Sequence, residues 1–218
     1  MSAVPHPLRE RGIDILADLV GFPSVSLSPN DDIVAYIERW LDAHGIASQR
    51  DAHEDGKRFN LLARIGPDWP GGILLSGHLD VVPADTAFWQ SDPFSLRRAG
   101  GRLYGRGAVD MKGFLAMALA MAQEFQARAD KLNEPLYLAF TFDEELGCFG
   151  AERMPAFLEA AGVTPRIAII GEPTGMMPIN AHKGGMELVT HVRGAAAHAS
   201  KPHNGVNAIF AASKIIGF

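Results

Sequence analysis

The sequence contains a single cysteine, Cys148, in 218 residues. One cysteine cannot form a disulfide within the chain, which excludes the disulfide framework of many small secreted domains. The first residues have neither the basic patch nor the apolar core of a signal peptide. No apolar run approaches the roughly 20 residues that a membrane-spanning helix needs. We therefore expect a protein of the cytoplasm that has no membrane segment.

The sequence also has little excess charge and no cluster of lysine or arginine. Its formal net charge is −5, whereas a nucleic-acid-binding surface needs a basic stripe, so we expect no nucleic-acid partner. Hydrophobic residues make up 47% of the chain and charged residues 21%, as in an ordinary globular protein. The length leaves room for one large domain, or for one domain and part of another.

Helix and strand patterns alternate along the first part of the chain. Apolar residues at helical spacing predict helices over residues 8–20 and 28–45. The segments typical of strands are residues 46–50, 59–65 and 71–75. This mixture predicts an α/β fold, in which helices cover both faces of a sheet.

Two later stretches are rich in loop residues. Residues 83–98 predict a long irregular loop, and long ordered loops in compact domains tend to be functional. Residues 103–113 form a glycine-dense turn before an apolar helix predicted over residues 114–128. This turn lacks the third glycine of a dinucleotide site and the Gly-Lys-Ser/Thr of a phosphate loop, which argues against phosphate binding.

Polar side chains follow three apolar strands. They are His78 and Asp80 after residues 71–75, Asp143, Glu144 and Glu145 after residues 136–142, and Glu172 after residues 166–170. A further carboxylate, Asp110, precedes the helix. Because ligands of open α/β sheets bind beyond the carboxyl ends of the strands, we expect these side chains to converge. The alternatives are a polar pair in a solvated turn at residues 78–80 and a solvated acidic turn at residues 143–145.

One histidine with several carboxylates and no cysteine is a ligand set that suits zinc, manganese or cobalt. A bridging carboxylate with further ligands on each side can hold two metals roughly 3.5–4 Å apart, the spacing found in hydrolases that activate water between two ions. Adjacent acids such as Glu144 and Glu145 allow one to bind metal while the other acts as a base.

Four short motifs contain these residues. They are Gly-His-Leu-Asp at residues 77–80, Gly-Arg-Gly-Ala-Val-Asp-Met-Lys-Gly at residues 105–113, Asp-Glu-Glu-Leu-Gly at residues 143–147 and Gly-Glu-Pro-Thr at residues 171–174. In this order they resemble the dinuclear zinc family of aminoacylases and carboxypeptidases, peptidase family M20. The resemblance implies a zinc-peptidase-like three-layer fold with helices on both faces of the sheet. Within the family, residues 89–94 and 179–184 are most similar to acetylornithine deacetylases.

The resemblance implies a metal-binding role for four matching residues. His78 and Glu172 would bind the first of two Zn²⁺ ions, with Co²⁺ as an alternative metal. Glu145 would bind the second ion. Asp110 would bridge both, and its peptide bond to Met111 would be cis.

The resemblance also implies three residues that act in catalysis. Glu144 would be the general base and proton shuttle, and Asp80 would orient the ring of His78. His198, in the motif at residues 194–200, would reach across a dimer to the neighbouring active site and stabilise the oxyanion. Taken alone, a histidine among alanines is more often structural or simply exposed.

The resemblance divides the chain into a catalytic metal-binding domain over residues 1–181 and the beginning of an α+β lid and dimerisation domain over residues 182–218. In the second part we expect a strand over residues 186–192 and a lid helix within residues 202–218. Family members continue further and supply a final histidine to the second metal. We therefore expect a C-terminally truncated chain that is a homodimer through the lid domain when complete.

The function implied by the resemblance is a metal-dependent amidohydrolase. It would use a metal-activated water to remove the acetyl group from N-acetylornithine, a small N-acylated amino acid of arginine biosynthesis. One alternative is another N-acyl-amino-acid hydrolase or a desuccinylase of the same family. A second alternative is a catalytically incompetent fragment whose exposed apolar edges associate.

Overall fold

A computed structural model describes residues 7–186 and 188–217 of the chain. The chain forms two units and passes from one to the other between Met176 and Met177. The domain boundary predicted from the sequence lies a few residues later, after residue 181.

The first unit is built on a five-stranded sheet. In the order in which they lie side by side, its strands are β1 (Ser48–Ala52), β2 (Phe59–Ile65), β6 (Leu136–Thr141), β3 (Ile73–His78) and β7 (Ile167–Ile170). The pairs β1–β2 and β2–β6 are antiparallel, whereas β6, β3 and β7 run parallel. The strands predicted at residues 59–65, 136–142 and 166–170 are confirmed to within a residue, and β1 begins two residues after its predicted start.

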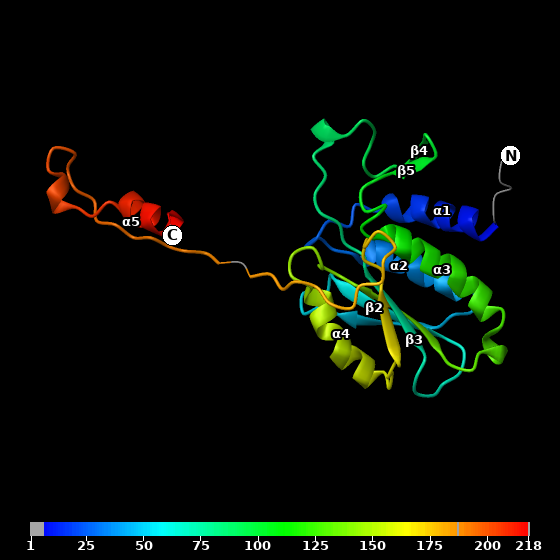
Figure 1. The fold of residues 1–218 in the computed structure, drawn as a ribbon. Helices are drawn as coiled ribbons and strands as arrows, with labels where there is room; N and C mark the ends of the chain where they lie inside the picture. Colours follow the sequence, from blue (N-terminus) through cyan, green and yellow to red (C-terminus); the bar gives the residue numbers. More distant parts are fainter. Residues whose placement is uncertain (1–6, 187, 218) are drawn as a thin grey trace. The chain divides into compact units, whose positions relative to one another are not determined.

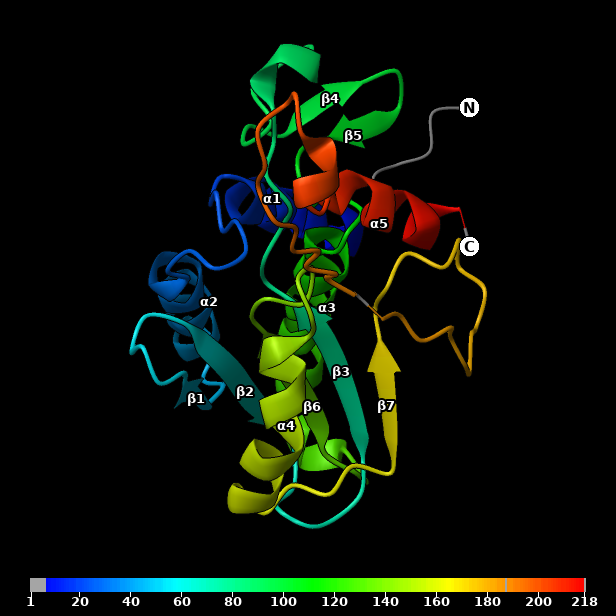
Figure 2. The same cartoon turned by 90° about the vertical axis from the view of Figure 1, so that its left-hand side faces the viewer.

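Helices cover both faces of this sheet (Figure 2). The helices α1 (Pro7–Val20), α2 (Asp31–Ala43) and α3 (Lys112–Gln126) lie on one face, and α4 (Phe149–Ala160) lies on the other. Strand alternation explains the two layers, because successive side chains point to opposite faces. In β2, Leu61 packs into the core formed with α1, α2 and α3, whereas its neighbour Leu62 packs with Met154 of α4. The predicted α/β architecture is confirmed.

The sequence patterns missed α4. Met154, Phe157 and Leu158 pack on the sheet, with spacings of three and four residues that are typical of a helix. Pro155 lies inside this helix and obscured the pattern, because proline usually ends a helix. Proline is usually confined to the first turn of a helix, and Pro155 is the seventh residue of α4.

A short hairpin was also missed at the end of the loop predicted over residues 83–98. It pairs β4 (Arg97–Ala99) with β5 (Arg102–Tyr104). Gly100 and Gly101 connect the strands at φ values of 58° and 74°. Two consecutive residues at positive φ are the requirement of a type I′ turn, which glycine meets without steric cost.

The second unit contains little regular structure. Ala195 and Val206 exchange two backbone hydrogen bonds of 2.9 Å, and α5 (Ala208–Ile216) follows, capped by the side chain of Asn207. The predicted lid helix is thus confirmed as a helix. The strand predicted over residues 186–192 is wrong for residues 186 and 188–192, which are irregular, and Glu187 lies outside the described residues. An alternating pattern gives no strand without a neighbour to pair with.

None of the helices in the described ranges is long and apolar enough to cross a membrane. The cytoplasmic location inferred from the lone cysteine stays a prediction.

Candidate metal centre

The candidate site lies where the three parallel strands end. His78 is the last residue of β3 and pairs in register with Thr141, the last residue of β6. Glu144 and Glu145 follow β6, and Glu172 follows β7. Because β6, β3 and β7 are parallel, these side chains leave the sheet at one edge. This is the arrangement expected from the sequence.

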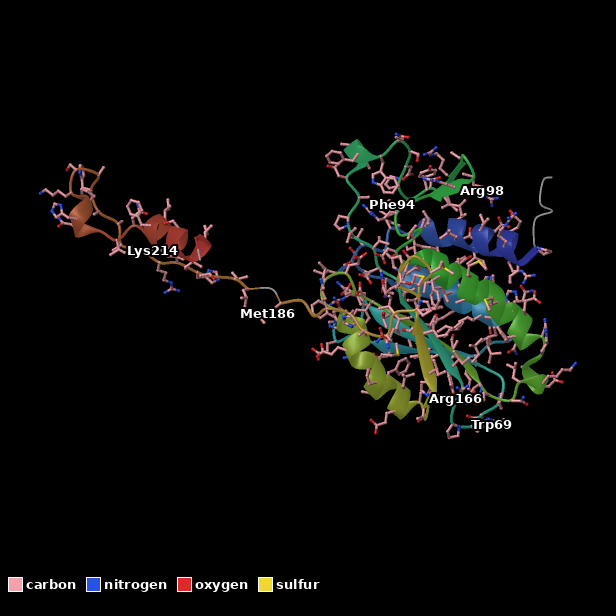
Figure 3. All side chains as sticks on the ribbon, viewed as in Figure 1. Trp69, Phe94, Arg98, Arg166, Met186 and Lys214 are labelled. Carbon is pink, nitrogen blue, oxygen red and sulfur yellow. The ribbon has the colours of Figure 1, made fainter. Side chains whose placement is uncertain are left out.

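The figures show which end of the unit this is. Trp69 and Arg166, which precede β3 and β7, lie at one end of the unit, and Phe94 and Arg98 lie at the opposite end (Figure 3). The loop that ends in the β4–β5 hairpin therefore rises from the same end as the carboxyl ends of the strands (Figure 1).

Asp110 is brought to the same edge by the start of α3. Its peptide bond to Met111 is cis, as the resemblance implies. Two glycines allow α3 to approach the strand ends. A Cβ atom on Gly77 would lie 2.5 Å from the Met111 methyl carbon, and one on Gly171 would lie 2.0 Å from Cγ of Phe114. A larger residue at Gly171 would press on the Phe114 ring and push α3, and with it Asp110, away from the sheet. One at Gly77 would displace the packed side chains of Met111 and Leu115.

Three of the predicted metal ligands form one compact cluster. One donor atom from each of His78, Asp110 and Glu172 lies within 4.8 Å of the others. Nε2 of His78 lies 3.1 Å from Oδ1 of Asp110 and 3.9 Å from Oε1 of Glu172. These residues come from β3, the loop before α3 and the end of β7, so only the tertiary fold brings them together.

The ring of His78 is buried and fixed through its other nitrogen. Nδ1 lies 2.9 Å from the backbone carbonyl oxygen of Asp80 and 3.5 Å from its carboxylate. A hydrogen bond from Nδ1–H to the carbonyl leaves Nε2 unprotonated in the neutral ring and directed at Asp110 and Glu172. Asp80 thus contacts the ring as predicted, and its main-chain oxygen is the nearer partner.

The carboxylate of Asp80 has a second set of partners. It accepts hydrogen bonds from the hydroxyl of Ser26 at 2.7 Å and from the backbone N–H groups of Glu144 and Glu145 at 3.0 and 3.3 Å. These bonds, with that of His78, keep the pKa of Asp80 low although burial opposes this. Asp80 therefore fixes the backbone of the two acids as well as the histidine. No pattern in the sequence singled out Ser26.

Asp143 differs from the two acids that follow it. Its side chain is buried, forms an ion pair with Arg58 and accepts a 2.7 Å hydrogen bond from the backbone N–H of Leu27. The alternative of a solvated acidic turn is therefore wrong for this residue. Asp143 anchors the turn so that Glu144 and Glu145 remain partly exposed.

Glu144 and Glu145 lie beside the three-residue cluster. Oε2 of Glu144 lies 3.8 Å from Nε2 of His78, and Oε1 of Glu144 lies 3.5 Å from the sulfur of Cys148. Glu145 lines a cavity together with Asp110 and is not part of the cluster of three. The two acids therefore face different parts of the site, as a division of labour between base and ligand requires.

The charges at this edge favour a bound cation. Burial, followed by the neighbouring carboxylates, raises the pKa values of both Glu145 and Glu172. Burial lowers the pKa of His78, but Asp80, Asp110 and Glu172 together raise it to about 9. Carboxylates that repel each other around one imidazole are stabilised in their ionised form by a divalent cation. The donor set of imidazole nitrogen and carboxylate oxygens fits zinc or cobalt.

Lys112, the first residue of α3, was not singled out by the sequence reasoning. Its side chain is fully buried, and Nζ donates to the backbone oxygens of Leu19 at 3.0 Å and Phe22 at 2.7 Å. Burial lowers its pKa to about 7. These bonds fasten the start of α3, next to Asp110, to the end of α1.

His198 lies in the second unit and is exposed. Its Nδ1 accepts hydrogen bonds from the hydroxyl of Ser200 at 2.8 Å and from the Ser200 backbone N–H at 3.2 Å. The role of His198 in a neighbouring active site stays a prediction.

Known proteins match both the sequence and the fold. A sequence model described as Peptidase family M20/M25/M40 matches residues 74–217. An acetylornithine deacetylase of Proteus mirabilis is 37% identical over 204 residues, which are 90% of this chain and 51% of that protein. One of Shigella sonnei is 38% identical over 204 residues, 90% of this chain and 52% of that protein. The chain thus spans about half the length of the curated relatives it matches.

Among solved structures, human carnosine dipeptidase 1 matches with a TM-score of 0.63 and 25% identity, over 74% of this chain and 38% of that one. The fold described above is therefore similar to that of human carnosine dipeptidase 1.

Proposed function

The chain belongs to peptidase family M20/M25/M40, and we propose that it hydrolyses the amide bond of N-acetylornithine with the help of bound metal ions. The observation that carries this proposal is the cluster of His78, Asp110 and Glu172 at the carboxyl edge of the sheet. The two curated relatives named as acetylornithine deacetylases support the choice of substrate.

In this proposal His78 and Glu172 would hold one zinc or cobalt ion, Glu145 would hold a second, and Asp110 would contribute to both. Such ions, when bound, would polarise the amide carbonyl and lower the pKa of water to about 7. Asp110 suits the bridging role because it lies 3.1 Å from His78 and also lines the cavity that contains Glu145.

Glu144 is the proposed general base. It takes a proton from the attacking water and delivers it to the leaving amine, and acetate and a free amine result. Its backbone is fixed by Asp80, and its carboxylate is about one third exposed, so that water can reach it.

The direct test is hydrolysis by the chain loaded with zinc or cobalt. We expect release of acetate from N-acetylornithine and slower release of succinate from N-succinyl-diaminopimelate. Faster release of succinate would identify a desuccinylase. Zinc binding without hydrolysis of either compound would instead support the alternative of a catalytically incompetent metal-binding fragment.

We also propose that two copies of the protein associate through the second unit and that His198 acts in the site of its partner. Two inactive variants, Glu144→Ala and His198→Ala, should then complement each other. Random mixing makes half of the dimers mixed, and each mixed dimer has one intact site, so activity should return to about a quarter of the unchanged protein. Activity that stays at zero after mixing would contradict a role in the partner's site.

A further inference from the structure

A cavity of about 360 Å³ opens beside the candidate metal centre. Asp110 and Glu145 form one part of its wall. Trp89 and the segment around Arg106 form another part. A molecule in this cavity would therefore contact two proposed metal ligands on one side and an arginine on the other.

The guanidinium of Arg106 is held in place, but it donates few hydrogen bonds within the protein. It lies over the ring of Trp89 at 5.3 Å from the ring centre, and Nη2 donates to the backbone oxygen of Pro83 at 3.2 Å. Its Nε is buried without a hydrogen-bond partner. Stacking and a single backbone contact fix the plane of the group and leave most of its five N–H donors available.

Two other arginines of this unit are paired with carboxylates. Arg58 pairs with Asp143, and Arg153 pairs with Asp51. Within the part of the chain that the structure describes, Arg106 has no ion pair. A fixed guanidinium without a carboxylate, in the wall of a cavity, is an arrangement suited to binding a carboxylate of another molecule.

We propose that Arg106 binds a carboxylate group of the substrate in this cavity. The inference rests on the proposed function, because the reacting amide must lie at Asp110 and Glu145 while the carboxylate reaches Arg106. Arg106 would thereby select substrates that carry a carboxylate, such as N-acylated amino acids, and reject neutral amides.

The test compares two ligands that differ only in this charge. Succinate has two carboxylates, and succinamate has one carboxylate and one neutral amide. One carboxylate of either compound can reach the metal, so only succinate has a second one for Arg106. In calorimetric titrations of the zinc-loaded chain, succinate should bind about tenfold more tightly than succinamate.

Variants at Arg106 should change this preference. Arg106→Met should abolish the difference between the two ligands, and Arg106→Lys should retain part of it, because lysine keeps the charge but loses the planar pair of donors. The control is Arg102→Met, which removes an exposed arginine of β5 and should leave the preference unchanged.

A purely structural role for Arg106 gives a different result. If it only fastens the loop through Pro83 and Trp89, Arg106→Met will lower the melting temperature and weaken both ligands equally, which overturns the proposal. If the chain binds no zinc, the proposed function fails, and the same titrations of the zinc-free chain decide the role of Arg106. If the zinc-free chain prefers succinate and Arg106→Met does not, the carboxylate site is still supported. If the unchanged zinc-free chain shows no preference for succinate, the carboxylate site is refuted.

Discussion

Replacement of Glu144 by alanine should lower the turnover of N-acetylornithine about 10²–10⁴-fold, the usual contribution of a general base. Zinc content should stay close to that of the unchanged protein. The reason is geometric, because Glu144 lies 3.8 Å from Nε2 of His78 and outside the cluster of His78, Asp110 and Glu172. Rates measured with the zinc-loaded protein check the fall in turnover. Metal analysis of the same samples checks the zinc content.

The outcome of this substitution also separates Glu144 from its neighbour. Glu145→Ala should lose one zinc ion together with activity. If Glu144→Ala loses the zinc instead, the two roles are exchanged. Glu152→Ala is the matched control, since this exposed glutamate of α4 belongs neither to the three-residue cluster nor to the cavity wall and should affect neither quantity.

Replacement of Asp110 by alanine should remove both metals. A carboxylate that binds two ions contributes to the affinity of each, so its loss should reduce zinc content from two ions towards zero and abolish turnover. The side chain of Asp110 is about half exposed, and its removal should cost little folding stability. Metal analysis after gel filtration gives the zinc content, and thermal melting of the metal-free variant gives the stability.

Asp130→Ala is the control for this experiment, because Asp130 is an exposed carboxylate in the turn after α3. It should keep the zinc content of the unchanged protein. One tightly bound zinc ion in Asp110→Ala would show that Asp110 is a ligand of a single metal and that the bridging assignment is wrong.

The sheet and most of its helices could be predicted because their apolar patterns are strong. Residues 136–142 are almost wholly apolar and the strand β6 there is buried throughout, and residues 59–65, which form β2, are mostly apolar and buried apart from the partly buried Phe59 and the exposed Arg64. The start of β1 was less accurate, because Ile46 is buried in the core before the strand begins. Burial and strand pairing usually coincide, and at this position they do not.

The convergence of His78 and Glu172 could be predicted because both follow apolar strand segments, and parallel strands share a carboxyl edge. Asp110 precedes α3 instead of following one of these strands, and the packing of α3 brings it to the same edge. The contacts that hold these residues in position could not be predicted. Ser26 reaches Asp80 only because Val25 forms an isolated bridge with Val81, a pairing between loops that have no strand pattern. The cavity at Arg106 likewise depends on how the loop after β3 folds over the glycine-dense turn.

The central claim is that His78, Asp110 and Glu172 bind a metal, and anomalous X-ray diffraction at the zinc absorption edge tests it most directly. Crystals of the zinc-loaded chain should show a peak at about 2.0–2.1 Å from Nε2 of His78, with carboxylate oxygens of Asp110 and Glu172 at similar distances. A zinc peak bound elsewhere, with none at Nε2 of His78, would contradict the account.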